Sequence, residues 1–199
     1  MRGEMKRILS CLDRRWLAAA SHELSNNLST LIDSELSDTI EHVLAWVSFF
    51  PGEVDLTSFI NQQMDKRKIY LPRTLPDRTM SFVSIGKDWI GSMQFGNHGI
   101  PEPGTVSGEA YDLRWARDTV VITPGLAFDK EGGRIGRGGG YYDRFFARHP
   151  MMDSTKIGVG WTLQMVDLVP TESHDALMDW VCHERGYQRT SFAFEDEDE

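Results

Sequence analysis

The sequence predicts one three-layer α/β domain, in which a mostly parallel sheet carries helices on both faces and an N-terminal helical pair precedes the sheet. Two observations predict this class. Short, almost wholly apolar runs alternate with stretches of helical periodicity, as in βαβ units whose strands are buried on both faces. A chain of 199 residues also has the length of one domain. We expect the domain to span residues 1–194 and the acidic residues 195–199 to form a disordered tail.

The helical pair is predicted by apolar residues that recur every three or four positions across residues 5–36. Within this stretch, the segment AAASHE at residues 18–23 resembles a junction between two helices. We expect Ser21 to cap the second helix, because its hydroxyl can accept a hydrogen bond from a free backbone N–H in the first turn.

A first βαβ unit is predicted next. Residues 43–50, VLAWVSFF, form an apolar run that ends at Pro51 and Gly52, as in a strand buried on both faces. Asp55 can cap the following helix, whose apolar residues share one side: Leu56, Phe59, Ile60 and Met64. The segment KIYLP at residues 68–72 gives the second strand, so the connection should be a right-handed crossover.

The second half of the chain predicts a strand–loop–helix–strand unit in the same sheet. Its strands are expected at residues 118–124 and 156–161, and its helix at 139–148. Prolines predict a loop over residues 98–104. Two further strands are expected, at residues 80–85 and 179–182.

Composition argues against several classes of protein. The formal charge of −9 and the pI near 5.1 do not provide the basic surface of a general nucleic-acid-binding protein. Cys11 and Cys182 lack the spacing of a disulfide scaffold or metal site, which favours a reducing compartment. The charged N-terminus has no signal-peptide pattern, and the run at residues 43–50 is too short to cross a bilayer. We therefore expect a soluble cytoplasmic protein with no nucleic-acid or membrane partner.

The most distinctive segment is GGRIGRGGG at residues 132–140, in which six of nine residues are glycine. A loop between a buried strand and a helix lies at the carboxyl edge of an α/β sheet, where such sheets bind ligands. Glycine lets a ligand approach the backbone, and Arg134 and Arg137 carry forked donors suited to phosphate. We interpret the segment as an anion site, although it lacks the Lys-Ser or Lys-Thr of a P-loop. A flexible surface loop and a single RNA-binding RGG element are the alternatives.

The three residues that follow, Tyr141, Tyr142 and Asp143, stand at the mouth of this predicted site. Adjacent tyrosines can pack in a core, but here their rings can also stack on a flat heterocycle. Asp143 can be a carboxylate in the first turn of a helix or, beside a triphosphate, a magnesium ligand. The local sequence leaves both pairs of alternatives open.

The segment PGLAFDKEGGRIGRGGGYYDR, residues 124–144, resembles the signature of the 5-formyltetrahydrofolate cyclo-ligase family, also called methenyltetrahydrofolate synthetase. The resemblance extends over most of the chain. It includes WVSFFPGEVD at residues 46–55, KIYLPR at 68–73, GIPEP at 99–103 and IGVGWTLQMVDLVPTESHD at 157–175.

This resemblance implies an enzyme, an ATP-dependent ligase that forms a C–N bond by cyclisation. It implies that the formyl oxygen of 5-formyltetrahydrofolate attacks the γ-phosphate of ATP to give an imidoyl phosphate. The neighbouring folate nitrogen then closes the ring, and phosphate leaves to give 5,10-methenyltetrahydrofolate. ATP and Mg²⁺ are the implied cofactors. The folate substrate and ATP are the small-molecule partners, and we expect the protein to be a monomer.

The resemblance also implies roles for individual residues. The catalytic residues are Arg137 and Tyr142. The residues that bind ATP are Arg2, Lys6, Arg134, Gly136, Arg137, Gly138, Gly139, Gly140 and Tyr141. The residues that bind the folate are Ser48, Glu53, Gly138, Tyr141 and Tyr142. Of these, Glu53 accepts hydrogen bonds from the pterin, and the magnesium ligands are Asp143 and Asp175.

Four positions depart from the family's pattern. Arg2 and Lys6 stand where the family has a lysine and an arginine that reach the nucleotide, so their identities are exchanged. A charged, solvent-facing first turn is the alternative for this pair. Ser48 replaces a larger apolar residue, and Cys182 replaces a threonine. The basic pair and Ser48 motivate a second hypothesis, a diverged relative that binds folate or nucleotide without this reaction. A third hypothesis, a structural or RNA-interacting protein that uses the RGG element, conflicts with the acidic charge.

Overall fold

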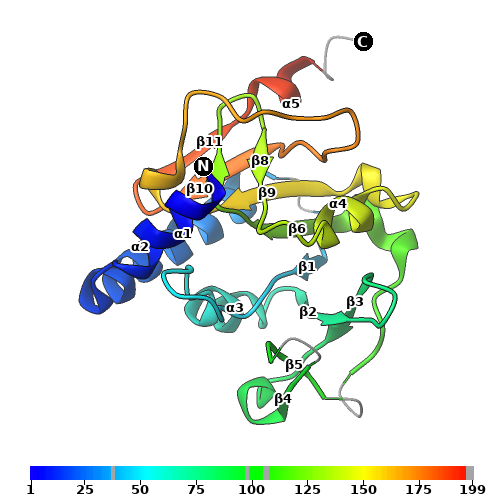
Figure 1. The fold of residues 1–199 in the computed structure, drawn as a ribbon. Coiled ribbons are helices and arrows are strands. Elements are labelled where there is room, and N and C mark those ends of the chain that lie inside the picture. Colours follow the sequence, from blue (N-terminus) through cyan, green and yellow to red (C-terminus); the bar gives the residue numbers. More distant parts are fainter. Residues whose placement is uncertain (37–38, 97–98, 105–107, 196–199) are drawn as a thin grey trace.

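The structure is a computed structural model that describes residues 1–36, 39–96, 99–104 and 108–195. A seven-stranded sheet runs through it in the order β11-β10-β9-β6-β1-β2-β3 (Figure 1). Its strands are β1 (His42–Leu44), β2 (Lys68–Thr74), β3 (Met80–Ser84), β6 (Thr119–Pro124), β9 (Thr155–Val159), β10 (Trp180–His183) and β11 (Gly186–Arg189).

The sheet is mostly parallel, which confirms the predicted fold class. β10, β9, β6, β1 and β2 pair in parallel, while β3 and β11 are antiparallel edge strands. The α-helices are α1 (Arg2–Ser10), α2 (Arg14–Ser34), α3 (Thr57–Gln63), α4 (Tyr141–Phe146) and α5 (Ser191–Glu195). Short 3₁₀ helices are η1 (Trp89–Ser92), η2 (Leu113–Asp118), η3 (Met151–Asp153) and η4 (Thr162–Gln164).

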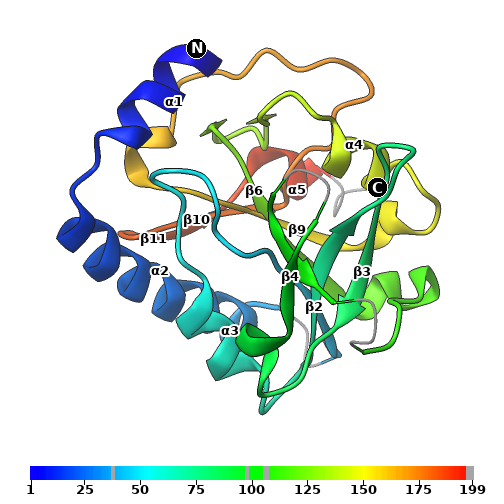
Figure 2. The same cartoon turned by 60° about the horizontal axis from the view of Figure 1, so that its bottom comes forward.

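Each face of the sheet has its own hydrophobic cluster, because successive side chains of a strand point to opposite faces. In β1, Val43 belongs to a cluster with Leu28 of α2 and Phe59 of α3. The next residue, Leu44, belongs to a second cluster that includes Phe145 of α4. α2 and α3 therefore cover one face and α4 packs on the other, as Figure 2 shows.

Successive strands are added to the sheet in opposite directions on the two sides of the β1–β6 pair. From β1 the chain passes through α3 to β2 on one side, whereas from β6 it passes through α4 to β9 on the other. β1 and β6 are neighbours in the sheet, so a crevice opens beyond their carboxyl ends. Open α/β sheets bind their ligands in such a crevice.

The predicted break between the N-terminal helices is wrong. The break lies at residues 11–13, where the Asp13 carboxylate accepts hydrogen bonds from the backbone N–H of Arg15 and Trp16 and so caps α2. Ser21 lies buried inside α2, and its hydroxyl accepts the backbone N–H of Asp55 instead. The small residues before Ser21 do not interrupt the helix, because alanine favours a continuous one.

The predicted strand over residues 43–50 is longer than the observed one, because β1 ends at Leu44. Ala45 and Trp46 are nevertheless buried, and Trp46 lines a pocket at the end of the sheet. An apolar run indicates burial, and both residues are buried in the hydrophobic cluster that contains α2 and α3. The Ala45 N–H also donates to the Tyr70 carbonyl of β2 at 2.9 Å, so contact with the sheet continues one residue past β1. The helix predicted after Asp55 is confirmed as α3, and the Asp55 carboxylate accepts the backbone N–H of Thr57.

Three smaller elements differ from the prediction. The loop predicted at residues 98–104 contains β5 (Pro101–Pro103), which pairs with β4 (Met93–Phe95); prolines are tolerated in such a two-stranded edge ribbon. His98 of that loop lies outside the described residues. The glycine segment contains β8 (Arg134–Ile135), which forms a hairpin with β7 (Ala127–Phe128). The edge strand β11 was not predicted.

The acidic segment predicted as a tail begins at Glu195, which ends α5, and residues 196–199 lie outside the described residues. In the part of the chain that the structure describes, no helix combines the length and the apolar character needed to cross a membrane.

Candidate functional site

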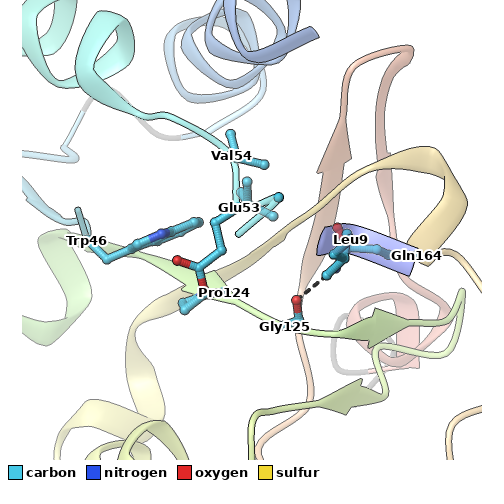
Figure 3. Close-up of a pocket in the computed structure, with 9 residues that line it drawn as sticks. Leu9, Trp46, Glu53, Val54, Pro124, Gly125 and Gln164 are labelled. Atoms are coloured by element: carbon cyan, nitrogen blue, oxygen red, sulfur yellow. Dashed lines mark hydrogen bonds between the residues drawn. The ribbon is translucent and has the colours of Figure 1, made fainter. Parts of the chain in front are cut away.

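A small pocket lies beyond the carboxyl ends of β1 and β6, at the crevice that the topology predicts (Figure 3). The segment after β1 contributes one wall and the segment after β6 another, and α1 closes a third side. Figure 3 shows the carboxylate of Glu53 beside the Trp46 ring and directed toward Pro124. The lining residues are Leu9, Trp46, Gly52, Glu53, Val54, Pro124, Gly125, Val159 and Gln164.

The turn at Gly52 brings α1 into contact with the wall after β1. Gly52 has a φ of +75°, and a Cβ there would overlap the Leu9 carbonyl oxygen. The backbone of this turn can therefore approach the end of α1 only because residue 52 is glycine. On the other side of the turn, the indole N–H of Trp161 donates to the Gly52 carbonyl at 2.7 Å.

Glu53 and Arg137 join the two walls of the pocket. Nε and Nη2 of Arg137 each lie 2.9 Å from Oε1 of Glu53. The other carboxylate oxygen, Oε2, accepts the backbone N–H groups of Phe49 and Phe50 at 3.0 Å each. The structure thus brings the predicted folate-binding carboxylate into direct contact with a predicted phosphate-binding guanidinium.

Arg134 lies inside the glycine segment and not at its surface. Its side chain is 4% exposed, and Nη2 lies 2.5 Å from Oδ1 of Asp143. Nη1 donates to the Pro124 carbonyl at 3.3 Å, while Nε is buried without a partner among the described residues. Arg134 therefore connects the end of β6 to the start of α4, and its charge lies beneath the loop.

The first helix reaches the glycine segment through Arg2, whose Nε donates to the Gly136 carbonyl at 3.2 Å. Lys6 lies one turn further along α1 and its side chain is exposed. The two residues are four positions apart, so they share one face of the helix. The structure therefore places the N-terminal basic pair on the helix that borders the predicted phosphate loop.

The glycines beside Arg137 give the loop conformations that other residues rarely adopt. Gly138 has a φ of +102°, and no atom of a described residue beyond its chain neighbours lies within 4 Å of the point that a Cβ would occupy; Gly140 has a φ of +63° at the start of α4. A Cβ at Gly136 would lie 2.9 Å from Nη1 of Arg134, and one at Gly139 would lie 2.8 Å from the Tyr141 ring. Gly138 and Gly140 therefore favour glycine for their backbone conformation, and Gly139 favours it because of the close approach of the Tyr141 ring.

The two tyrosines have different surroundings. The Tyr141 ring lies beneath the guanidinium of Arg144, 5.4 Å from its carbon to the ring centroid. The Tyr142 ring lies 5.8 Å from the Arg134 guanidinium and 6.3 Å from the Phe146 ring. Burial raises the pKa of Tyr142 above its ordinary value. A tyrosine hydroxyl is already protonated at neutral pH, and burial favours this state further, so Tyr142 can donate a hydrogen bond.

The two predicted magnesium ligands have different partners. Asp143 contacts Arg134 through Oδ1, and Oδ2 has no hydrogen bond from the described residues. Asp175 lies in the loop before β10, where its Oδ2 accepts the backbone N–H of Glu172 at 2.8 Å and its Oδ1 lies 3.9 Å from His174. Within the described ranges, no three His, Cys, Asp or Glu side chains gather closely enough to hold a metal ion.

Two buried side chains that hold the site together were given no role from the sequence. Asp129 accepts the backbone N–H groups of Glu131 and Gly133 through Oδ1, and that of Val169 through Oδ2. Gln164 donates to the Gly125 carbonyl at 2.8 Å, the dashed line in Figure 3, and accepts the backbone N–H of Trp161. Both residues lie within segments that resemble the cyclo-ligase family, and this resemblance was the only feature of the sequence that could have drawn attention to them.

Comparison with known proteins identifies a family that matches most of the chain. The model of the 5-formyltetrahydrofolate cyclo-ligase family matches residues 1–184. The chain is 29% identical to the 5-formyltetrahydrofolate cyclo-ligase of Saccharomyces cerevisiae in an alignment that covers 91% of this chain and 92% of the yeast protein. It is 27% identical to the Haemophilus influenzae protein of the same name, over 88% of this chain and 91% of that one.

Solved structures give the same result. The NMR structure of Aquifex aeolicus 5,10-methenyltetrahydrofolate synthetase matches with a TM-score of 0.76 and 26% identity, covering 96% of this chain and 91% of that one. The Mycoplasma pneumoniae 5,10-methenyltetrahydrofolate synthetase matches with a TM-score of 0.67 and 16% identity, covering 92% and 96% of the two chains, and so shares the fold.

Proposed function

Because the chain belongs to the 5-formyltetrahydrofolate cyclo-ligase family, we propose that it converts 5-formyltetrahydrofolate to 5,10-methenyltetrahydrofolate with ATP and Mg²⁺. The proposed reaction passes through a phosphorylated formyl group, and it releases ADP and phosphate. The reason for using ATP is chemical, since an amide oxygen is a poor leaving group and a phosphate is a good one.

The contact between Glu53 and Arg137 is the observation that carries this proposal. It joins a carboxylate suited to a pterin with a guanidinium suited to a phosphate, at the crevice where α/β sheets bind ligands. A folate held on the Glu53 side would place its formyl group toward the glycine segment. Phosphoryl transfer depends mainly on such positioning and on neutralising charge.

We assign the nucleotide to the glycine segment. The backbone N–H groups of Gly136, Gly138, Gly139 and Gly140 are the donors proposed for phosphate oxygens, supported by the positive φ of Gly138 and Gly140. The proposed cations are Arg137, Arg134, Arg2 and Lys6. Arg2 is supported by its contact with Gly136, and Arg134 by its buried Nε, which a ligand oxygen could satisfy.

We assign the folate to the side of Glu53, whose carboxylate would accept the amino and ring N–H groups of the pterin. Tyr142 is the proposed catalytic hydroxyl, because it lies in the first turn of α4 beside Arg134, where its hydroxyl could donate a hydrogen bond toward a developing negative charge. Tyr141 would line the same side, and Ser48, half-buried at the end of the wall after β1, completes the proposed folate contacts.

The carboxylates present fit a magnesium ion in chemistry, since Mg²⁺ takes one or two carboxylates together with phosphate oxygens. Oδ2 of Asp143, which accepts no hydrogen bond from the part of the chain that the structure describes, is the first proposed ligand, and Asp175 is the second. When bound, the ion would neutralise charge on the phosphates. Arg134 would position Asp143 for this role through its contact with Oδ1.

The test is the near-ultraviolet absorbance of the protein mixed with 5-formyltetrahydrofolate and MgATP, because the methenyl product absorbs there and the substrate does not. We expect a rise that requires both ATP and Mg²⁺ and that Arg137→Ala abolishes. Arg117→Ala is the matched control, since Arg117 also pairs with a carboxylate, Asp153, but lies just before the amino end of β6. A flat trace from folded wild-type protein that still binds the folate would favour the diverged binding relative.

A further inference from the structure

The Arg137 guanidinium lies between the Glu53 carboxylate and the face of the Phe50 ring. Its carbon is 4.0 Å from the ring centroid, while Nε and Nη2 both bind Oε1 of Glu53. The other oxygen of Glu53 accepts two backbone N–H groups. A carboxylate offers roughly four acceptor positions, so Glu53 has none left for a further donor.

We propose that Arg137 occupies the pterin's place on Glu53, and that folate binding releases this guanidinium to the phosphates of ATP. The proposal rests on the proposed function, because it concerns how the two substrates of that site affect each other. It makes Arg137 the residue through which folate and nucleotide binding are coupled, and it makes Phe50 the ring on which either flat group stacks.

The chemistry of the two groups supports this exchange. A guanidinium and the aminopyrimidinone edge of a pterin are both flat, and both present N–H donors on an N–C–N unit. Each can therefore bind a carboxylate through paired N–H groups and stack on an aromatic face. Since Arg137 already fills Oε1 of Glu53, the pterin can bind there only when Arg137 has left.

The loop allows Arg137 to leave without disturbing the core. Its flanking residues are Gly136 and Gly138, and among the described residues beyond the chain neighbours no atom lies within 4 Å of a Cβ position at Gly138. The other two arginines of this region have closer partners: Arg134 binds Asp143 within its own segment, and Arg2 binds the Gly136 carbonyl. Arg137 is thus the glycine-segment arginine that is held by the folate-binding wall.

The consequence is positive coupling between the substrates. Without folate, Glu53 neutralises the charge of Arg137, so the glycine segment has less positive charge for a triphosphate. With folate bound, the guanidinium is free and the affinity for nucleotide rises. Linkage requires that nucleotide raise the affinity for folate by the same factor. The arrangement would favour ATP binding by protein molecules that already hold the folate.

The first test measures binding of a non-hydrolysable ATP analogue with Mg²⁺ by calorimetry, with and without 5-formyltetrahydrofolate. For the wild-type protein we expect folate to tighten analogue binding by about 5-fold to 150-fold, the usual range of coupling. Glu53→Gln should release Arg137, so it should bind the analogue more tightly than wild type when folate is absent. Asp153→Asn is the matched control, because it changes a carboxylate paired with Arg117 just before the amino end of β9.

The second test titrates the protein with 5-formyltetrahydrofolate in the absence of nucleotide. Arg137→Ala removes the competing guanidinium, so we expect it to bind 5-formyltetrahydrofolate more tightly than wild type while binding the ATP analogue more weakly. A pair that merely stabilises the fold would weaken both. Arg117→Ala should leave both affinities unchanged. Thermal unfolding of each variant shows that the folded proteins are being compared.

Three outcomes would overturn the inference, and they point to different errors. If wild-type protein turns over the folate but binds the analogue equally well with and without it, the coupling is absent and the proposed function stands. If Glu53→Gln does not raise analogue affinity and Arg137→Ala does not raise folate affinity, the pair is structural. A wild-type protein that binds neither compound would overturn the proposed function and the coupling together.

Discussion

Arg134 is almost fully buried, with Nη2 2.5 Å from Oδ1 of Asp143 and Nε without a partner among the described residues. Buried polar groups are nearly always hydrogen-bonded, so this unpartnered donor marks a point where a water molecule or a ligand oxygen belongs. The pair lies between the end of β6 and the start of α4, directly under the glycine segment. Loss of the Arg134–Asp143 pair should therefore lower the stability of the protein and weaken the proposed nucleotide binding.

Replacing Asp143 by Asn should lower the free energy of unfolding by about 3 kcal/mol, because it leaves a buried guanidinium without its countercharge; this is the low end of the range for a buried pair, since Asp143 is 25% exposed. Urea denaturation measures this change. The control is Asp65→Asn, which breaks the exposed pair between Asp65 and Lys87 and should cost less than about 1 kcal/mol. Similar losses in the two variants would show that burial of Arg134 does not govern the energetics of its pair.

Gly52→Ala should destabilise the protein by about 2–4 kcal/mol, because the added Cβ collides with the Leu9 carbonyl oxygen in a left-handed conformation. It should also reduce folate binding, since Glu53 is the next residue. Gly86→Ala is the matched control, as Gly86 has open space around it. An unchanged denaturation midpoint for Gly52→Ala would mean that α1 does not pack on this turn as described.

Asp129→Asn should loosen the β7–β8 hairpin. The buried carboxylate accepts three backbone N–H groups, and an amide places a donor where an acceptor is needed. We expect a loss of about 2–4 kcal/mol and faster amide hydrogen exchange at Gly133 and Val169. Exchange at β1 and β2 should change less. Equal acceleration throughout the sheet would indicate global destabilisation without a local role for Asp129.

Stability should fall as the pH falls below about 6.5, and His42 should contribute to that loss. Burial lowers the pKa of His42, as does the charge of Lys68 to a lesser degree, while Glu41 and Asp118 oppose the shift. The folded state therefore binds the proton less readily than the unfolded state, whose histidine has a pKa of about 6.5. Stability is full above this pH and declines as the pH falls toward the lower folded pKa.

The measurement is the urea midpoint between about pH 7.5 and pH 5, which brackets the pKa of an unfolded histidine. His42→Gln should reduce the slope of stability against pH in this window. His183, whose pKa burial also lowers, should account for a second part of that slope. His174→Gln is the control, because His174 is 71% exposed. A slope that is the same in wild type and His42→Gln would rule out a contribution from this ring.

The site could be predicted only in part from the sequence. The glycine segment and its two arginines could be identified because glycine permits unusual backbone conformations and arginine carries forked hydrogen-bond donors. The family signature supplied the roles of Glu53 and the aspartates. The contact between Arg2 and Gly136 joins residues 134 positions apart, and that between Arg137 and Glu53 joins residues 84 positions apart. A local sequence pattern cannot predict contacts between residues so far apart in the chain.

By itself, the sequence determined the α/β class, the positions of the main strands along the chain and the place of the glycine segment between β6 and α4. These follow from periodicity and backbone preference, which act over a few residues. The tertiary structure decided that Ser21 lies inside a helix, that β1 is short, that Arg134 is buried and that Arg137 binds Glu53. Each of these depends on which segments pack against one another in the folded protein. Burial and hydrogen-bond partners are set by contacts between segments that are distant in the chain.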